Sequence, residues 1–201
     1  MKYYVESYGC TMNHGEGRDL AEDMSSLGFE PATSAEDADV VVLNTCTVVE
    51  TTEKHMLSRI SQLRSQGKEI IVTGCMAKAQ PSRIEIRLPD APIIPPENYS
   101  TFKQKIMEKY GIQGCATSVN LKSDAILPIA QGCLGNCSYC ITKIARGDLK
   151  SYPMAQLSEK FGSFLERGCK EILITAQDTA AYGMDTGENL PDLMKALLAR
   201  E

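Results

Sequence analysis

The sequence predicts an α/β protein: a parallel, doubly wound-like sheet, followed by a shorter second series of βα units. Segments with strand and helix patterns alternate along the chain. Two of the strand segments, Asp39–Leu43 (DVVVL) and Glu69–Thr73 (EIIVT), are continuous apolar runs, which are typical of strands buried on both faces of a parallel sheet. Glycines end several of the helical segments. A polar segment without periodicity separates the two series.

The order of elements follows from these patterns. In the first series we expect strands at Lys2–Ser7, Asp39–Leu43, Glu69–Thr73 and within 91–94 (APII), and helices at Gly15–Leu27, Glu50–Gln66, from Pro81 to before Pro89, and at Tyr99–Tyr110. In the second we expect strands at Ile126–Ala130 and Glu171–Thr175 and helices at Met154–Arg167 and Leu190–Arg200. The predicted domains are 1–115 and 126–201, with 116–125 as linker. Two βα units are too few for a barrel, so we expect a truncated chain.

Composition narrows the class of protein. Of the 201 residues, 43% are hydrophobic and 23% charged, which is an ordinary globular balance. No apolar run is long enough to span a membrane and no signal peptide is evident, so we expect a cytoplasmic protein. The net charge of −5 gives no support for a nucleic-acid partner. Eight cysteines in such a chain favour metal or cluster ligation over disulfides.

Three cysteines each follow a predicted strand. Cys10 follows KYYVES, Cys46 follows VVVLN, and Cys75 follows EIIVTG. Ligands bind parallel sheets at the carboxyl ends of the strands, where the following loops converge, so we expect these cysteines to lie together. The alternative is that each is a buried structural cysteine.

A second set is local in sequence. Cys133, Cys137 and Cys140 form a C-x3-C-x2-C pattern in GCLGNCSYC, where the glycines and Asn136 disfavour a helix. A zinc site is the alternative, but zinc generally takes four ligands. Three thiolates suit a four-iron cluster with one iron left open for an outside ligand. The remaining Cys115 and Cys169 are interpreted as structural.

These motifs resemble those of a known family. GCLGNCSYC is similar to the loop of radical S-adenosylmethionine (SAM) enzymes, in which three cysteines hold a 4Fe-4S cluster and SAM binds the open iron. The resemblance places Tyr139 near the adenine of SAM. The segments GCTMNHGEG, LNTCTVVETTEKH and VTGCMA resemble the methylthiotransferase domain, whose three cysteines hold an auxiliary cluster. The chain is thereby identified as a member of the radical SAM methylthiotransferase family, which implies two 4Fe-4S clusters, SAM and a partial TIM barrel after the first domain.

Within this family, CSYCITKIARGDLKSYP and ITAQDTAAYGMDTGENLP most resemble the archaeal and eukaryotic branch. That branch adds a methylthio group to carbon 2 of N6-threonylcarbamoyladenosine at position 37 of tRNA. The resemblance implies that the Cys133/Cys137/Cys140 cluster cleaves SAM and that the Cys10/Cys46/Cys75 cluster presents sulfur. It further implies an electron donor and the tRNA anticodon stem-loop as partners, the latter held mainly by a C-terminal RNA-binding domain absent from this chain. Isopentenyladenosine and a ribosomal-protein aspartate remain alternative substrates.

Several polar residues are further candidates. Gln177 and Asp178 follow the second strand of the second series and are candidates for SAM contact, or for capping the next turn. Lys143, Arg146 and Lys150 are candidates for contacting a carboxylate or phosphate, or else form a solvated face. Asn13 and Asn44 flank cluster cysteines and are candidates for hydrogen bonds to sulfur or for loop turns. His14 and His55 lack ligand spacing.

Two other functions compete with the enzyme. A non-enzymatic iron–sulfur carrier is one, although two clusters with open sites argue against it. A zinc-binding nucleic-acid module is the other, against which the acidic charge and the missing fourth ligands weigh.

Overall fold

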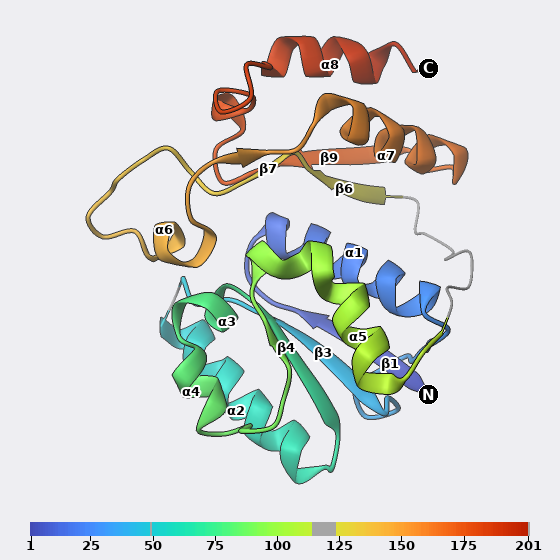
Figure 1. The fold of residues 1–201 in the computed structure, drawn as a ribbon, viewed down its shortest axis with the longest axis vertical. Helices are drawn as coiled ribbons and strands as arrows, with labels where there is room; N and C mark the ends of the chain where they lie inside the picture. Colours follow the sequence, from blue (N-terminus) through green and yellow to red (C-terminus); the bar gives the residue numbers. More distant parts are fainter. Residues whose placement is uncertain (49, 114–123, 201) are drawn as a thin grey trace. The chain divides into compact units, whose positions relative to one another are not determined.

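The computed structural model describes residues 1–48, 50–113 and 124–200. The chain divides into two compact units, Met1–Val119 and Asn120–Glu201 (Figure 1). Most of the predicted linker, 116–123, lies outside the described residues, as does Cys115, so the domain boundaries stay a prediction. The last two linker positions, Asp124 and Ala125, instead begin a strand.

The first unit contains a five-stranded parallel sheet. Its strand order is β2-β1-β3-β4-β5, and all four neighbouring pairs are parallel. This is the doubly wound arrangement that the sequence predicts, with the strand order reversing between β1 and β3. The strands are β1 (Lys2–Ser7), β2 (Glu30–Pro31), β3 (Val40–Thr45), β4 (Glu69–Gly74) and β5 (Ile93–Ile94).

Helices cover both faces of this sheet (Figure 1). One core combines β3 and β4 residues such as Val41 and Val72 with Met56 and Ile60 of α2 (Glu50–Ser65), and also takes in α3 (Cys75–Ala79) and α4 (Pro81–Glu85). The opposite core combines Val40 and Val42 with α1 (Thr11–Ser26) and α5 (Phe102–Tyr110), which follows the 3-10 helix η1 (Pro96–Thr101). Alternate residues of β3 therefore face opposite helical layers, which explains why DVVVL is apolar throughout.

The helices differ in detail from the sequence expectation. α1 begins at Thr11, four residues before the predicted start at Gly15, because Met12 and Asn13 are buried against the sheet. α3 and β2 were not predicted, since both are too short to carry a periodic pattern. The segment expected to be one helix at Tyr99–Tyr110 begins as η1 and continues as α5.

The second unit contains one parallel βαβ unit followed by a further helix. β6 (Asp124–Pro128) pairs in parallel with β9 (Glu171–Thr175), and α7 (Met154–Glu166) lies between them in the chain. α8 (Leu190–Leu198) follows β9 and the 3-10 helix η2 (Thr179–Ala181), and its Leu193 and Leu197 are buried with Leu157 of α7. These elements confirm the predicted start of a βα series.

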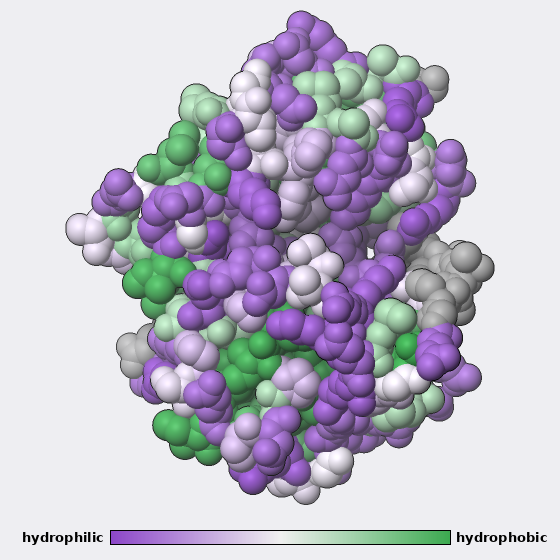
Figure 2. Space-filling view, in the orientation of Figure 1, coloured by the Kyte–Doolittle hydropathy of each residue, from purple (hydrophilic) through white to green (hydrophobic). Residues whose placement is uncertain are grey.

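A long loop of the second unit connects β6 to α7. Its two ends are joined by the short antiparallel pair β7 (Ala130–Gln131) and β8 (Lys150–Ser151), and it contains α6 (Ile141–Arg146). Within the part of the chain that the structure describes, no helix is long and apolar enough to cross a membrane. Figure 2 shows mainly hydrophilic residues on the face that it draws, interrupted by separate hydrophobic patches.

Candidate functional site

Cys10, Cys46 and Cys75 lie at one edge of the first sheet. Cys10 caps the amino end of α1, Cys46 directly follows β3, and Cys75 is the first residue of α3, directly after β4. β1, β3 and β4 are parallel neighbours, so their carboxyl ends meet at the same edge, and the edge between β1 and β3 is where the strand order reverses. The fold brings together three cysteines that are separated by 36 and 29 residues in sequence. Cys46 and Cys75 are buried, whereas Cys10 is exposed.

The segment before Cys10 packs against Cys46. Gly9 has a φ of +98°, and a β-carbon placed on it would lie 2.7 Å from both the Cβ and the Sγ of Cys46. Only glycine fits this position, on both conformational and steric grounds. Gly9 was not among the predicted site residues, although a glycine directly before a candidate ligand is a usable signal.

The side chain of Asn13 connects the three strand ends. Its Nδ2 donates to the carbonyl oxygens of Tyr8 (2.8 Å) and Thr45 (2.9 Å). The thiol of Cys75 donates to its Oδ1 across 3.8 Å. Asn13 is fully buried, so these bonds are shielded from water.

Asn44 and Tyr99 extend this network. The Nδ2 of Asn44 donates to the carbonyl oxygen of Asn13 (2.7 Å). The hydroxyl of Tyr99 accepts from the backbone N–H of Gly74 (3.0 Å) and donates to the Oδ1 of Asn44 (3.4 Å). The tyrosine approaches from η1, a part of the sequence that carried no signal for the site.

The first set of cysteines fits an iron–sulfur cluster in donor chemistry. The hydroxyl of Thr47, directly after Cys46, is buried and has no hydrogen-bond partner among the described residues, so it is available as a donor to a sulfur ligand. In the same described ranges, no three His, Cys, Asp or Glu side chains are close enough to hold a single metal ion. A four-iron cluster does not require that proximity, because each thiolate binds a different iron. The predicted non-ligands His14 and His55 are exposed on α1 and α2.

Cys133, Cys137 and Cys140 lie in the loop between β7 and α6. Gly132, with a φ of +79°, lies so close to the other end of the loop that a β-carbon there would be 1.9 Å from the carbonyl oxygen of Asp148. A β-carbon on Gly135 would lie 3.4 Å from the Sγ of Cys133 and 3.9 Å from that of Cys137, so both sulfurs flank one glycine. Cys137 is exposed, and the other two are partly exposed.

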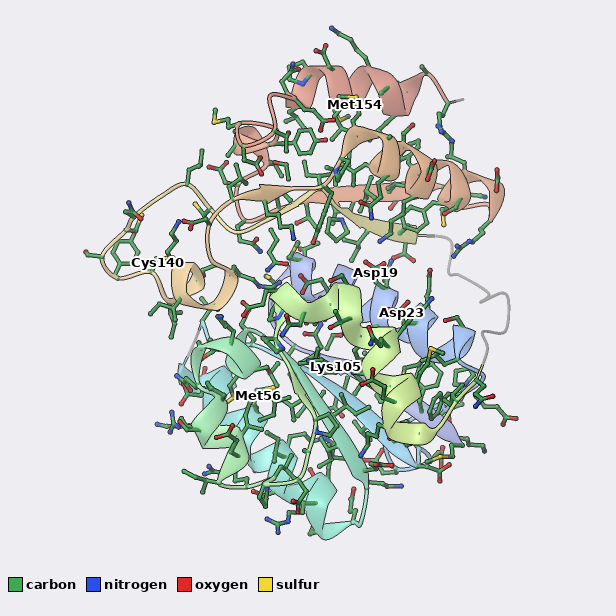
Figure 3. All side chains as sticks on the ribbon, in the orientation of Figure 1. Asp19, Asp23, Met56, Lys105, Cys140 and Met154 are labelled. Carbon is green, nitrogen blue, oxygen red and sulfur yellow. The ribbon has the colours of Figure 1, made fainter. Side chains whose placement is uncertain are left out.

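Backbone groups of this loop already point at sulfur. The N–H of Gly135 donates to the Sγ of Cys133 (3.2 Å). Cys140 (Figure 3) is the residue directly before the first turn of α6. The nearby backbone N–H of Lys143, and then the hydroxyl and N–H of Thr142, hold the pKa of the Cys140 thiol below its ordinary value. A thiolate is the form that ligates iron, so this environment favours ligation.

The positive residues after the loop have different surroundings. The Nζ of Lys143 donates to the carbonyl oxygen of Cys133 (2.6 Å) and pairs with Asp148 (2.6 Å), so it braces the loop. Arg146 is buried, and Lys150 is exposed on β8. Tyr139 is 89% exposed.

Gln177 and Asp178 follow β9 as predicted. The Oε1 of Gln177 accepts from the backbone N–H of Gly132 (2.7 Å), which connects the end of β9 to the cysteine loop. The Oδ1 of Asp178 accepts from the N–H of Ala180 and so caps η2, the alternative role that the sequence allowed. All described cysteines are free thiols, and Cys169 is buried in the core of the second unit, consistent with a structural residue.

Comparison with known proteins finds one matching family model and several curated relatives that share a name. Residues 2–94 match the model described as "Uncharacterized protein family UPF0004". A protein of Methanocaldococcus jannaschii named "Probable threonylcarbamoyladenosine tRNA methylthiotransferase" is 38% identical over 98% of this chain and 49% of its own length. The human threonylcarbamoyladenosine tRNA methylthiotransferase is 31% identical over 98% of this chain and 37% of its own length. Over nearly its whole length the chain is therefore similar to curated threonylcarbamoyladenosine tRNA methylthiotransferases. It spans about half, or less, of the length of these relatives.

A solved structure shares the fold. It is that of the radical S-adenosylmethionine methyltransferase TsrM from Kitasatospora setae, which carries cobalamin and a 4Fe-4S cluster. The TM-score is 0.60 at 13% identity, over 99% of this chain and 52% of that one. At this identity the likeness supports the fold alone, and the site must be argued from the chain's own residues.

Proposed function

We propose that the protein to which this chain belongs is a radical SAM enzyme that adds a methylthio group to carbon 2 of N6-threonylcarbamoyladenosine at position 37 of tRNA. The observation that supports this most is the placement of Cys10, Cys46 and Cys75 at one sheet edge, together with a separate C-x3-C-x2-C loop. The relatives named for this activity align over nearly the whole chain.

Two clusters are part of the proposal. Cys10, Cys46 and Cys75 would hold one 4Fe-4S cluster, and Cys133, Cys137 and Cys140 would hold the other. When bound, the second cluster together with SAM supplies one-electron chemistry able to act on an unactivated carbon, and the first supplies a sulfur site.

The residues of the chain have binding and positioning roles in this proposal. Lys143 and Gln177 both hold the start of the cysteine loop, through the Cys133 carbonyl and the Gly132 N–H. Tyr139 and Arg146 are proposed to contact SAM, as are Gln177 and Asp178. Asn13 and Asn44 hold the strand ends that carry the other three cysteines. Such positioning is the main contribution of a protein whose cofactors carry the reaction.

The substrate part of the proposal rests on the relatives. Their names specify threonylcarbamoyladenosine in tRNA. This chain has a net charge of −5, which supports the view that tRNA is held mainly by regions outside it. An electron donor is also required, and the cytoplasm is the proposed location because tRNA is modified there.

The test uses the full-length protein that contains this chain. It is loaded anaerobically with iron and sulfide and supplied with SAM, a reductant and tRNA carrying threonylcarbamoyladenosine. Nucleoside mass spectrometry should find the 2-methylthio product. Product from isopentenyladenosine tRNA, and none from threonylcarbamoyladenosine tRNA, would assign the protein to a different substrate.

A further inference from the structure

One side chain contacts the ends of all three strands that carry Cys10, Cys46 and Cys75. The amide of Asn13 donates to the carbonyl of Tyr8, two residues before Cys10, and to that of Thr45, one residue before Cys46. Its oxygen accepts from the thiol of Cys75. We propose that Asn13 is a positioning residue that holds the three cysteines in the arrangement needed for a cluster, an inference that rests on the proposed auxiliary cluster.

The orientation of this amide is determined by its partners. Nδ2 faces two carbonyl oxygens at 2.8 Å and 2.9 Å, so a flipped amide would place Oδ1 against both acceptors. The Oδ1 therefore faces Cys75. Asn13 belongs to α1, whose helical bonds fix its backbone, and Asn44 donates to its carbonyl. The helix α1 thus holds in place the side chain that sets the spacing of the three cysteine-bearing segments.

No isosteric residue can replace this function. Aspartate has the shape of asparagine but carries two oxygens that only accept when ionised, so it would repel the carbonyls of Tyr8 and Thr45. Alanine would remove the donor to both carbonyls, of which that of Thr45 is buried and that of Tyr8 partly buried. If Asn13 only fills space, Asn13→Asp should disturb the three cysteines less than Asn13→Ala does. If Asn13 positions the loops, Asn13→Asp should disturb them at least as much.

The first test needs no cluster. In the metal-free chain, alkylation of a buried thiol reports how often its surroundings open. Losing one buried and one partly buried hydrogen bond should speed alkylation of Cys46 and Cys75 about tenfold or more in both Asn13→Ala and Asn13→Asp. Cys169, buried in the second unit, serves as an internal reference that should not change.

A matched control separates positioning from general destabilisation. Tyr3→Phe removes a hydroxyl that donates to the carbonyl of Ala21 and bonds Ser25, at the other end of α1. This variant should leave the alkylation of Cys46 and Cys75 near the parental rate. Hydrogen exchange at the β3 amides should stay slow in the Asn13 variants. Parental alkylation rates in Asn13→Asp, or equal loss of protection throughout β3, would overturn the inference.

The second test measures the cluster. In a Cys137→Ala background only the auxiliary site should load, with about four irons per chain. Adding Asn13→Asp should lower the iron retained on gel filtration and change the electron paramagnetic resonance spectrum of what remains, while Tyr3→Phe should change neither. Full loading with the parental spectrum would refute positioning by Asn13 alone. If the background itself bound no iron, the proposed auxiliary cluster would fail, and this inference with it.

Discussion

Gly9 lies directly against Cys46, so that a β-carbon on Gly9 would be 2.7 Å from the cysteine sulfur. The contact joins the segment after β1 to the segment after β3, the two neighbouring strands between which the order of the sheet reverses. The site is therefore closely packed where these strands end, and small changes there should affect ligation before they affect the fold.

Replacing Gly9 with alanine tests this packing. The positive φ should cost about 1–3 kcal/mol of unfolding free energy, and the new methyl group should displace Cys46. We expect Gly9→Ala to lose most of the iron held by the first unit. Gly28→Ala is the matched control, because Gly28 also has a positive φ (+86°) but nothing within 4 Å of the added carbon. Denaturant unfolding and iron analysis compare the two; equal iron in both would argue against the contact being important.

Tyr99 offers a milder perturbation of the same site. Tyr99→Phe removes the acceptor for the Gly74 N–H, next to Cys75, and the donor to Asn44. We expect a loss of about 1 kcal/mol in urea unfolding and a weaker hold on iron. Tyr4→Phe removes a hydroxyl that makes no hydrogen bond within the described ranges, and it should change both quantities less.

The sequence was sufficient for four of the five strands of the sheet, all but β2, and for the positions of the cysteines after its strands. Apolar runs such as DVVVL identified β3 and β4, and the rule for parallel sheets then placed Cys46 and Cys75 at one edge. The early start of α1 was missed, because Asn13 is a poor helix former and Met12 and Asn13 are helical where they are buried against the sheet. Burial of this kind is a tertiary effect that local patterns do not contain.

The supporting contacts of the site were less predictable. Tyr99 reaches Gly74 from η1, and the distance of 25 residues between them carries no pattern. Gln177 was expected to face SAM, and its bond to the Gly132 N–H depends on how β9 ends beside the loop. The roles of individual ligand residues stay predictions until the variants are made.

Gln177 should position the cysteine loop through its oxygen. Gln177→Leu removes the acceptor for the Gly132 N–H, whereas Gln177→Glu keeps one. With the Cys133/Cys137/Cys140 cluster reconstituted, we expect Gln177→Leu to slow formation of 5′-deoxyadenosine from SAM about tenfold, from loss of one partly buried hydrogen bond. Gln177→Glu should retain more of the rate. A reversed order would indicate that the amide nitrogen, rather than the oxygen, is needed.

Asp23 on α1 (Figure 3) gives a prediction for pH. Burial raises the pKa of Asp23 above its ordinary value of 3.8, although Lys103 lies 3.2 Å away. The folded chain therefore binds this proton more tightly than the unfolded chain, and the parent loses stability as pH rises from 3.8 through the raised pKa. Asp23→Asn has no carboxyl group to titrate, so it does not lose stability over this pH range through residue 23. The stability of the variant relative to the parent should thus be more favourable at pH 7 than at pH 3.5, measured by urea unfolding; the opposite trend would mean that Lys103 outweighs burial.

Counting iron in two cysteine variants tests the central claim that the two triplets hold separate clusters. After anaerobic reconstitution the parent should hold about eight irons, and Cys46→Ala and Cys137→Ala about four each. Cys46→Ala should still convert SAM to 5′-deoxyadenosine when reduced, and Cys137→Ala should not. Loss of the same cluster in both variants, or zinc in place of iron in the parent, would contradict the account.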